Sequence, residues 1–327
     1  MIINQISGPV TCTQSNSDST LFFAYSNDLD HDLVYNSAAL IDRWLVNYGF
    51  SKFYTKFASC RLDTYPVSGN ITIDDSPHDF WNTVIRKLPD PSLSFPNSNF
   101  GSDVVDVVDN FLYTPSINLC KATIILLLKR NTNYIAEKDI EFIVSKLQQN
   151  HAFTWSIMSD TPSGGSYTNT VYEMVSESHG FAMFSNDSMF NQALGEFTEI
   201  WTTSGFLHSE NIIVSGNHST ELSPVTLPSK DVENNLVKVY ITVQDFPPPL
   251  EFQFFNFTFM PSSNDHKNVT LAVPASRLMP QTTADFDIIW LDFDVEYHVF
   301  LDYGYTLQNY AHRVEIRMFA NGYKQVK

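Results

Sequence analysis

The chain has 327 residues, with 36 acidic against 19 basic residues and a formal net charge of -17 at pH 7. Because no basic run offers to neutralise phosphates, we expect no nucleic-acid partner. Charged residues make up only 17% of the chain and aromatic residues 14%, a composition that indicates a folded protein and excludes a disordered one.

The first 17 residues, MIINQISGPVTCTQSNS, form a polar leader. They have neither the basic start nor the long apolar core of a signal peptide, so no signal peptide is visible in this chain. The longest fully apolar run, Ala122 to Leu128, is much too short to cross a bilayer and has the length of a buried strand. We therefore expect no membrane span.

Residues 18–203 alternate short apolar runs with helical patterns, beginning with the run LFFAY at Leu21–Tyr25. Helix starts and stops are marked by Ser76 as N-cap, Pro77 at the first helical position, and Gly49 at a C-cap. Strand and helix alternation with nearly unbroken apolar strands is typical of a doubly wound, mostly parallel sheet covered on both faces. We therefore predict one α/β domain over this range.

Residues 204–327 show a different pattern of strand-like pieces separated by Pro, Gly, Asn and Ser, with no convincing helix. Several short strands at close spacing predict a second, all-β sandwich domain. The segment FPPPL at Phe246–Leu250 must be a loop or an edge, because proline cannot donate to a strand ladder. Asp292, Asp294 and Glu296 alternate with apolar residues, so we expect their carboxylates to share one strand face.

Three cysteines, Cys12, Cys60 and Cys120, have no metal-ligand spacing and leave open one disulfide plus one buried thiol. Asn-x-Ser/Thr sequons are candidate glycosylation sites and are compatible with secretion, although a chain this rich in Asn, Ser and Thr contains about this many by chance. They occur at Asn70, Asn186, Asn217, Asn256 and Asn268.

The stretch LFFAYSNDLDHD runs from an apolar strand into an acidic cluster at the start of a helix. An EF-hand calcium loop would place Gly and Glu where Leu33 and Ala39 stand, so that match fails. The simplest interpretation is that Asp28, Asp30 and Asp32 cap the free N-H groups of the helix and meet the favourable end of its dipole.

The order of this strand and helix, then NSNFGSDVVDVVDNFL, KATIILLLKRN and AFTWSIMSD, resembles the von Willebrand factor A domain. In detail the chain is similar to a nematode-expanded, secreted A-type family of uncharacterised function. The resemblance covers roughly residues 18 to 200, and it implies an extracellular α/β domain that binds ligands through a divalent cation at the C-terminal edge of the sheet.

The metal motif of that family is incomplete in this chain. Its first element corresponds to AYSND, in which Ala24 replaces an Asp, Ser26 is retained and Asp28 replaces a second Ser. Ser98 stands where the family has a Thr, and the third element, in KATIILLLKRN, has no Asp. Mg²⁺ needs hard oxygen ligands in near-octahedral geometry, so we predict no metal and no cofactor at this edge.

Lys129 or Arg130 stands in place of the Asp of the third metal-motif element. A fixed cation at this position repels a metal and can pair with a neighbouring carboxylate. We therefore hypothesise that Lys129 or Arg130 takes the electrostatic place of the metal and pairs with Asp28.

No G-x-S-x-G nucleophile motif occurs, and the loop from Ser163 to Ser166 lacks a base at readable spacing. We therefore predict a non-enzymatic extracellular binding or adhesion module with an unknown protein or glycan ligand at the C-terminal edge of the sheet. The alternatives are a hydrolase with an unrecognised site at this edge, which a deep pocket with shifted pKa values would favour, and a structural glycoprotein. The candidate ligand residues are Ser26, Asp28, Ser98, Lys129, Arg130, Ser163 and Ser166.

Overall fold

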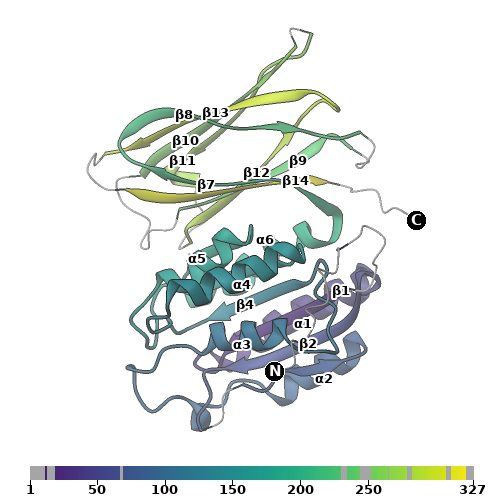
Figure 1. The fold of residues 1–327 in the computed structure, drawn as a ribbon, viewed down its shortest axis with the longest axis vertical. Helices are drawn as coiled ribbons and strands as arrows, with labels where there is room; N and C mark the ends of the chain where they lie inside the picture. Colours follow the sequence, from purple (N-terminus) through teal and green to yellow (C-terminus); the bar gives the residue numbers. More distant parts are fainter. Residues whose placement is uncertain are drawn as a thin grey trace, which may run out of the picture.

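A computed structural model describes Cys12 and residues 19–66, 69–229, 234–243, 252–263, 265–277, 282–306 and 311–321. The rest of the predicted leader and the proline-rich segment 246–250 lie outside the described residues. Figure 1 shows an α/β part with a β-sandwich stacked on it. In the described residues the α/β part contains a six-stranded sheet and the sandwich contains two four-stranded sheets.

The six-stranded sheet has the order β3-β2-β1-β4-β5-β6 and is parallel except for β3, which pairs antiparallel with β2. All residues of the central strands β1 and β4 are buried, as expected for strands covered by helices on both faces. The strands are β1 (Ser19–Ser26), β2 (Tyr54–Leu62), β3 (Thr72–Asp74), β4 (Thr123–Leu128), β5 (Phe153–Ser159) and β6 (Phe181–Ser185).

Alternate residues of β1 divide the core into two layers. Phe23 and Tyr25 pack with helices α1, α2 and α6, whereas Phe22 and Ala24 pack with α3, α4 and α5. The helices are α1 (His31–Asn47), α2 (Pro77–Arg86), α3 (Val104–Leu112), α4 (Glu137–Gln149), α5 (Asn169–Glu177) and α6 (Phe190–Thr203). Short 3-10 turns occur at η1 (Phe50–Phe53), η2 (Pro91–Leu93), η3 (Asp187–Met189) and η4 (Ala275–Arg277).

The predicted helix boundaries at α1 and α2 agree with the structure. Ser76 accepts a hydrogen bond from the Asp79 backbone N-H at 3.1 Å, and Pro77 opens the helix. Gly49 follows the C-cap of α1 with φ of 71°, a left-handed conformation that glycine adopts without steric cost.

The sandwich consists of the sheets β11-β10-β13-β8 and β12-β9-β14-β7, which enclose a common apolar core. The predicted fold class, a doubly wound mostly parallel sheet followed by an all-β sandwich, is therefore confirmed. The strands are β7 (Ser204–Val214), β8 (Asn217–Thr226), β9 (Leu236–Val243), β10 (Phe252–Pro261), β11 (Val269–Pro274), β12 (Ala284–Trp290), β13 (Glu296–Tyr305) and β14 (His312–Asn321).

The expectation that Asp292, Asp294 and Glu296 share a strand face is wrong. The chain leaves β12 after Trp290 and enters β13 only at Glu296, so the two aspartates lie in the connection between them. Asp294 has φ of 58° and accepts a hydrogen bond from the Ser229 backbone N-H at 3.0 Å. The alternation of acidic and apolar residues continues through the turn between β12 and β13. The ends of these strands are set by their antiparallel pairing with β9 and β10, which the local sequence does not reveal.

The β12-β9-β14-β7 sheet also packs against the α/β part with its other face. The ring of Phe319 in β14 lies 5.6 Å from Phe153 and 6.0 Å from Trp155, both in β5. Thr283 caps the free edge of β6, because its backbone N-H donates to the Phe184 carbonyl at 3.0 Å and its hydroxyl accepts from the Phe184 N-H at 3.0 Å. Covering an edge strand in this way satisfies its backbone groups and joins the two parts.

A buried ion pair reinforces this junction. Arg317 Nε donates to the Gly180 carbonyl at 2.6 Å, and the Ala182 backbone N-H donates to Glu315 Oε2 at 3.2 Å. Glu315 and Arg317 are both completely buried, 3.9 Å apart. Burial raises the pKa of the Glu315 carboxyl to about 7. Strand β14 therefore presents both charges of the pair to the edge of the α/β sheet.

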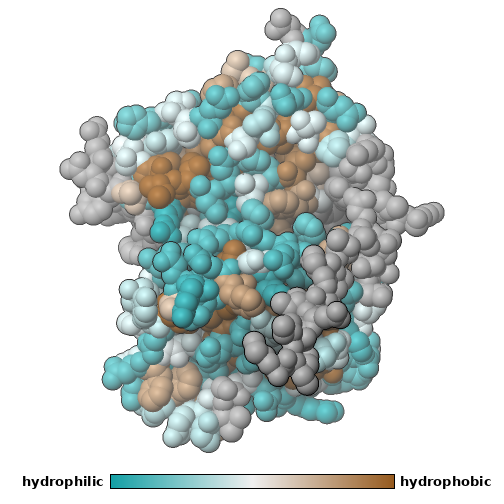
Figure 2. Space-filling model, in the orientation of Figure 1, coloured by the Kyte–Doolittle hydropathy of each residue, from teal (hydrophilic) through white to brown (hydrophobic). Residues whose placement is uncertain are grey.

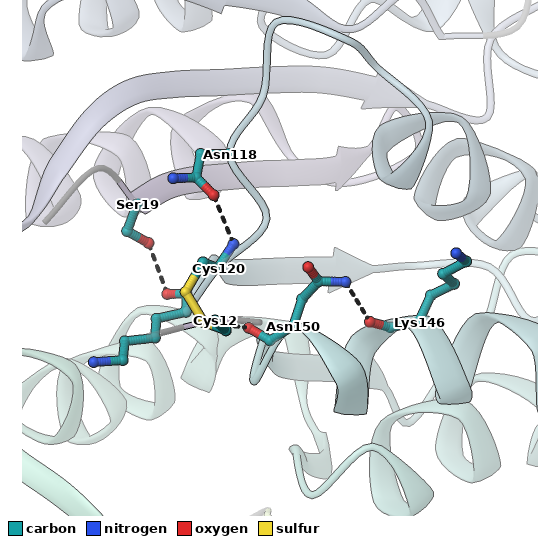
Figure 3. Close-up of a disulfide and its surroundings, with 7 residues drawn as sticks. Cys12, Ser19, Asn118, Cys120, Lys146 and Asn150 are labelled. Carbon is teal, nitrogen blue, oxygen red and sulfur yellow. Dashed lines mark hydrogen bonds between the residues drawn. A yellow bond between two sulfur atoms is a disulfide. The ribbon is translucent and has the colours of Figure 1, made fainter. Parts of the chain in front are cut away.

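The cysteines form one disulfide, Cys12–Cys120, and leave Cys60 as a buried thiol. Figure 3 shows the disulfide at the start of β4, beside the hydrogen bond from Ser19 Oγ to the Lys121 carbonyl at 2.7 Å. The cross-link spans 108 residues and ties Cys12 to the amino-terminal edge of the parallel sheet.

No helix in the described residues is long and apolar enough to cross a membrane. On the face of the molecule seen in Figure 2, hydrophobic and hydrophilic residues are interspersed over both the α/β part and the sandwich.

Candidate functional site

Three loops meet at the C-terminal edge of the parallel sheet, because the carboxyl ends of parallel strands lie on one side. They are the loop before α3 (residues 91–102), the loop after β4 (residues 129–136) and the loop after β5 (residues 160–168). The Gly165 N-H donates to the Ser98 carbonyl at 3.0 Å, and the Asn131 N-H donates to the Gly164 carbonyl at 2.9 Å. Backbone hydrogen bonds thus join the middle loop to the loop after β5, and that loop to the one before α3.

Arg130 and Asp28 form a buried ion pair at the centre of this edge. Arg130 donates through Nε at 3.0 Å and through Nη2 at 2.6 Å to Oδ2 of Asp28, and the two side chains are 4% and 8% exposed. Arg130 Nη1 donates to the carbonyls of Asn97 at 3.1 Å and Phe100 at 2.7 Å. The guanidinium also lies over the Phe95 ring, 5.3 Å from its centroid. All three guanidinium nitrogens of Arg130 thus donate to protein oxygens.

Ser163 completes the environment of Asp28 by donating its hydroxyl to Oδ2. Gly164 makes this arrangement sterically feasible, because a Cβ at this position would lie 2.1 Å from Arg130 Nη1 and 2.8 Å from the Ser98 carbonyl oxygen. The loop after β5 therefore packs directly against the ion pair. A glycine at position 164 is required for this loop to lie so close to the Arg130 guanidinium.

Lys129 points to a different carboxylate from the one that Arg130 contacts. Its Nζ lies 2.6 Å from Asp187 Oδ2 and donates to the hydroxyls of Ser159 and Thr161, each at 3.0 Å. Its backbone N-H donates to Ser26 Oγ at 3.0 Å. The two neighbouring cations, which follow the end of β4, therefore pair with two separate carboxylates.

A pair of carboxylates that no local sequence pattern predicts lies beneath the same edge. Asp63, at the end of β2, is fully buried and accepts the hydroxyl hydrogen bond of Ser26. The Asp63 N-H donates to Asp103 Oδ1 at 3.0 Å, and the Asp103 N-H donates to Asp63 Oδ1 at 3.3 Å. Burial, and then the nearby charge of Asp103, raise the pKa of Asp63 to about 7.

The sequence held one signal for this pair, an aspartate directly after a buried strand. Its partner Asp103 is 40 residues away along the chain, and only the topology of the sheet places Asp63 and Asp103 side by side. Burial also raises the pKa of Asp103. Burial and the nearness of the two carboxyls therefore disfavour the state in which both are charged.

The remaining predicted ligand residues take part in this edge to different extents. Ser98 is exposed and contributes its backbone carbonyl, and Ser166 is exposed and donates its N-H to the Thr132 carbonyl at 3.1 Å. Of the three capping candidates, Asp30 is the N-cap of α1 and Asp32 lies in its first turn, whereas Asp28 pairs with Arg130. The acidic cluster thus divides into a capping part and an ion-paired part.

The side chains at this edge do not fit the divalent cation that the family resemblance implies. The Oδ2 atom of Asp28 already accepts hydrogen bonds from the Arg130 guanidinium and the Ser163 hydroxyl. The side chain of Ala24 has no oxygen and is buried in the core. Within the part of the chain that the structure describes, no group of three or more His, Cys, Asp and Glu residues is arranged to hold a metal. A cation at Asp28 would have to displace Arg130 and leave its charge unpaired.

The sequon asparagines lie in two places. Asn70 is exposed ahead of β3, and Asn186 beside β6 accepts from the Ser188 N-H at 3.1 Å. The other three belong to the β11-β10-β13-β8 sheet: Asn217 begins β8, Asn256 is half-buried in β10, and Asn268 is exposed just before β11. The structure therefore brings three of the five sequons to one sheet of the sandwich.

A family model described as a domain of unknown function (DUF7154) matches residues 210–321, within the sandwich. No curated protein matches the chain. Among solved structures, a von Willebrand factor type A protein from Catenulispora acidiphila is similar at 9% identity and a TM-score of 0.35, over 94% of this chain and 59% of that one. This chain therefore spans less than two thirds of that protein's length.

Two further structures are similar to the chain. The SpRpn10 VWA domain has 11% identity and a TM-score of 0.37, with 55% of this chain and 94% of that domain covered. Proximal thread matrix protein 1 from the mussel byssus has 10% identity and a TM-score of 0.35, with 61% of this chain and 50% of that protein covered. Two of these three structures are thus von Willebrand A proteins and the third is a matrix protein.

Proposed function

We propose that the chain is a non-enzymatic extracellular binding or adhesion module whose ligand docks at the C-terminal edge of the parallel sheet without a divalent cation. In this proposal residues 18–203 form a von Willebrand A-like domain, residues 204–327 form a β-sandwich domain, and residues 1–17 are a leader. Membership of a nematode-expanded secreted family belongs to the same proposal.

The observation that supports cation independence is the buried pair of Arg130 and Asp28. Removing one partner of such a pair is unfavourable by about 3–5 kcal/mol, because the other charge is left buried without compensation. A metal that competes for Asp28 meets this penalty, whereas a ligand that docks on the closed loops does not.

The shape of the edge favours binding over hydrolysis. The hollow beside Lys129 and Tyr167 is about 230 Å³ including its solvent-open part, and its interior has no room for a water molecule. Asp63 has the raised pKa of a catalytic carboxyl, but it is fully buried and hydrogen-bonded to Ser26. A general acid must lie within hydrogen-bonding distance of the substrate atom that takes its proton, and this buried carboxyl has no such access.

Two features support an extracellular location. A disulfide such as Cys12–Cys120 persists in oxidising compartments and is rare in the cytosol. Three sequons on one sheet of the sandwich would place glycans together, away from the proposed ligand edge.

An adhesion assay with a glycan wedge tests the proposal. Asn99→Ser completes a sequon at Asn97, on the exposed loop before α3. The matched control, Glu221→Asn, completes a sequon with Leu222 and Ser223 on the exposed side of β8. Both proteins are made in a glycosylating host, and the full chain is immobilised on beads.

Beads are scored for attachment to cell surfaces and extracellular matrix of the source organism, with and without EDTA. We expect the wild type and the Glu221→Asn control to attach equally, with or without EDTA, and Asn99→Ser to lose attachment. Attachment that survives Asn99→Ser, or that EDTA abolishes, would contradict the proposal.

A further inference from the structure

The three loops of the ligand edge contain no charged residue along most of their length. Residues 91–102, 131–136 and 161–169 include no Asp, Glu, Lys or Arg, although 17% of the chain is charged and its net charge is -17. The cations next to them, Arg130 and Lys129, are paired with Asp28 and Asp187. An anionic ligand therefore finds no free cation at these loops, and Asp160, the carboxylate at the start of the loop after β5, is half-buried and accepts from the Asn186 side chain at 3.5 Å.

Each of the three loops exposes one large aromatic side chain. Phe100 is 41% exposed, Tyr134 is 69% exposed and Tyr167 is 45% exposed. The rings of Tyr134 and Tyr167 meet edge to face, with centroids 5.4 Å apart and an interplanar angle of 72°. The edge thus offers apolar ring surfaces with phenolic hydroxyls at their rims.

The backbone beneath these rings is fixed. The Thr132 hydroxyl donates to the Tyr167 carbonyl at 3.0 Å, and the Tyr167 N-H donates to the Thr132 carbonyl at 2.9 Å. The Ser102 N-H donates to the Asn131 carbonyl at 2.7 Å, and a Cβ on Gly101 would lie 2.2 Å from the Asn133 nitrogen. A ligand therefore meets rings on a pre-organised backbone, which lowers the entropic penalty of binding.

Neutral hydrogen-bonding groups surround the rings. Carboxamides supply both donors and acceptors, and hydroxyls can take either role. The exposed members are Asn97, Ser98, Asn99, Asn133, Ser166, Thr168 and Asn169.

We propose that this charge-free aromatic edge, formed by residues 91–102, 131–136 and 161–169, binds neutral carbohydrate. Sugar rings have apolar C-H faces that stack on exposed aromatic rings, and their hydroxyls match carboxamides and hydroxyls without any charge. Interfaces between proteins are also rich in aromatic residues, but they are enriched in Arg as well, which these loops lack. The inference rests on the proposed function, because it names the ligand class of the same edge.

The test uses the full glycosylated chain on an array of neutral oligosaccharides, built from glucose, mannose, galactose or N-acetylglucosamine, beside sulfated and sialylated ones. Calorimetry then measures affinity for the strongest neutral ligand. We expect binding to neutral oligosaccharides that EDTA and high salt leave unchanged. Alanine at Tyr134 or Tyr167 should weaken affinity by about tenfold or more, as truncation of an aromatic anchor does.

Tyr113→Ala is the matched control, because Tyr113 is 57% exposed and stacks on Phe142 beside α3 and α4, outside the three loops. It should bind like the wild type. Circular dichroism melts of all three variants check that they remain folded, as expected for substitutions of exposed side chains.

Four results would overturn the inference: no binding to any neutral oligosaccharide, binding to anionic glycans only, loss of binding in EDTA, or an affinity of the Tyr134→Ala and Tyr167→Ala variants equal to that of the wild type. If purified oligosaccharides do not bind but Asn99→Ser still abolishes bead attachment, the edge takes a protein ligand and the proposed function stands. If Asn99→Ser leaves attachment intact, the proposed function itself fails.

Discussion

Replacing Arg130 with methionine removes the guanidinium from the ligand edge while keeping a side chain of similar length. Asp28 then stays buried, with only the Ser163 hydroxyl still donating to the oxygen that Arg130 contacted. Because both partners are at least nine-tenths buried, we expect Arg130→Met to lower the free energy of unfolding by about 3–5 kcal/mol. The matched control is Lys56→Met, since the Lys56–Asp75 pair is largely exposed and should be worth about 1 kcal/mol or less.

Urea denaturation of Arg130→Met, Asp28→Asn and the double variant measures the coupling between the two charges. Each single variant leaves one charge unpaired, whereas the double variant leaves none. We therefore expect the double variant to be more stable than the sum of the two single losses predicts. If each single variant lowers the free energy of unfolding by less than about 1 kcal/mol and the two effects simply add, the Arg130–Asp28 pair does not stabilise the edge as described.

Three further predictions concern stability. The pKa of Asp63 is raised from 3.8 to about 7, so the folded state retains a proton that the unfolded state releases. Its stabilising contribution is full below pH 4 and is lost as pH rises through 7, so Asp63→Asn should flatten the fall in melting temperature between pH 4 and pH 8. Gly164→Ala should lower the free energy of unfolding by about 1–3 kcal/mol, because the added Cβ clashes with Arg130. Gly195→Ala is the control in the same urea titrations and should not lower it, because nothing lies within 4 Å of its added Cβ. Reducing the Cys12–Cys120 disulfide should lower the free energy of unfolding by about 2–5 kcal/mol in urea titrations with and without dithiothreitol.

Outcomes that contradict these three predictions are equally specific. A pH profile of Asp63→Asn that parallels the wild type would mean that this carboxyl is charged in the folded protein. Equal stability of the two glycine variants would show that the loop after β5 yields without displacing Arg130. Identical urea curves with and without reductant would show that the cross-link adds nothing to stability.

The order of strands and helices in the α/β part could be predicted because its strands are continuous apolar runs between capped helices. Ser76 and Gly49 marked boundaries through local chemistry, which the sequence contains. Strand β8 was not predicted, because Asn217–Thr226 is mostly exposed and polar. Its place in the sheet depends on pairing with β13, a long-range contact that no local pattern encodes.

The ligand edge could be predicted only as a set of neighbouring loops. The sequence limited the predicted partner of Asp28 to Lys129 or Arg130. Which of the two side chains reaches Asp28 depends on the path of the chain after β4, and in the structure it is Arg130. The Asp63–Asp103 pair could not be predicted, because Asp63 follows β2, Asp103 precedes α3, and the two meet only through the topology of the sheet. Charge pairing across loops is a tertiary property, and a pattern along the chain cannot specify it.

Calorimetric titration of Mg²⁺, Mn²⁺ and Ca²⁺ into the full wild-type chain, with Asp28→Ala measured in parallel, tests cation independence most directly. The Arg130–Asp28 pair predicts no saturable heat for any of the three ions at this edge, and the same baseline for the wild type and the variant. Saturable binding of any of these ions to the wild type that Asp28→Ala abolishes would contradict the account.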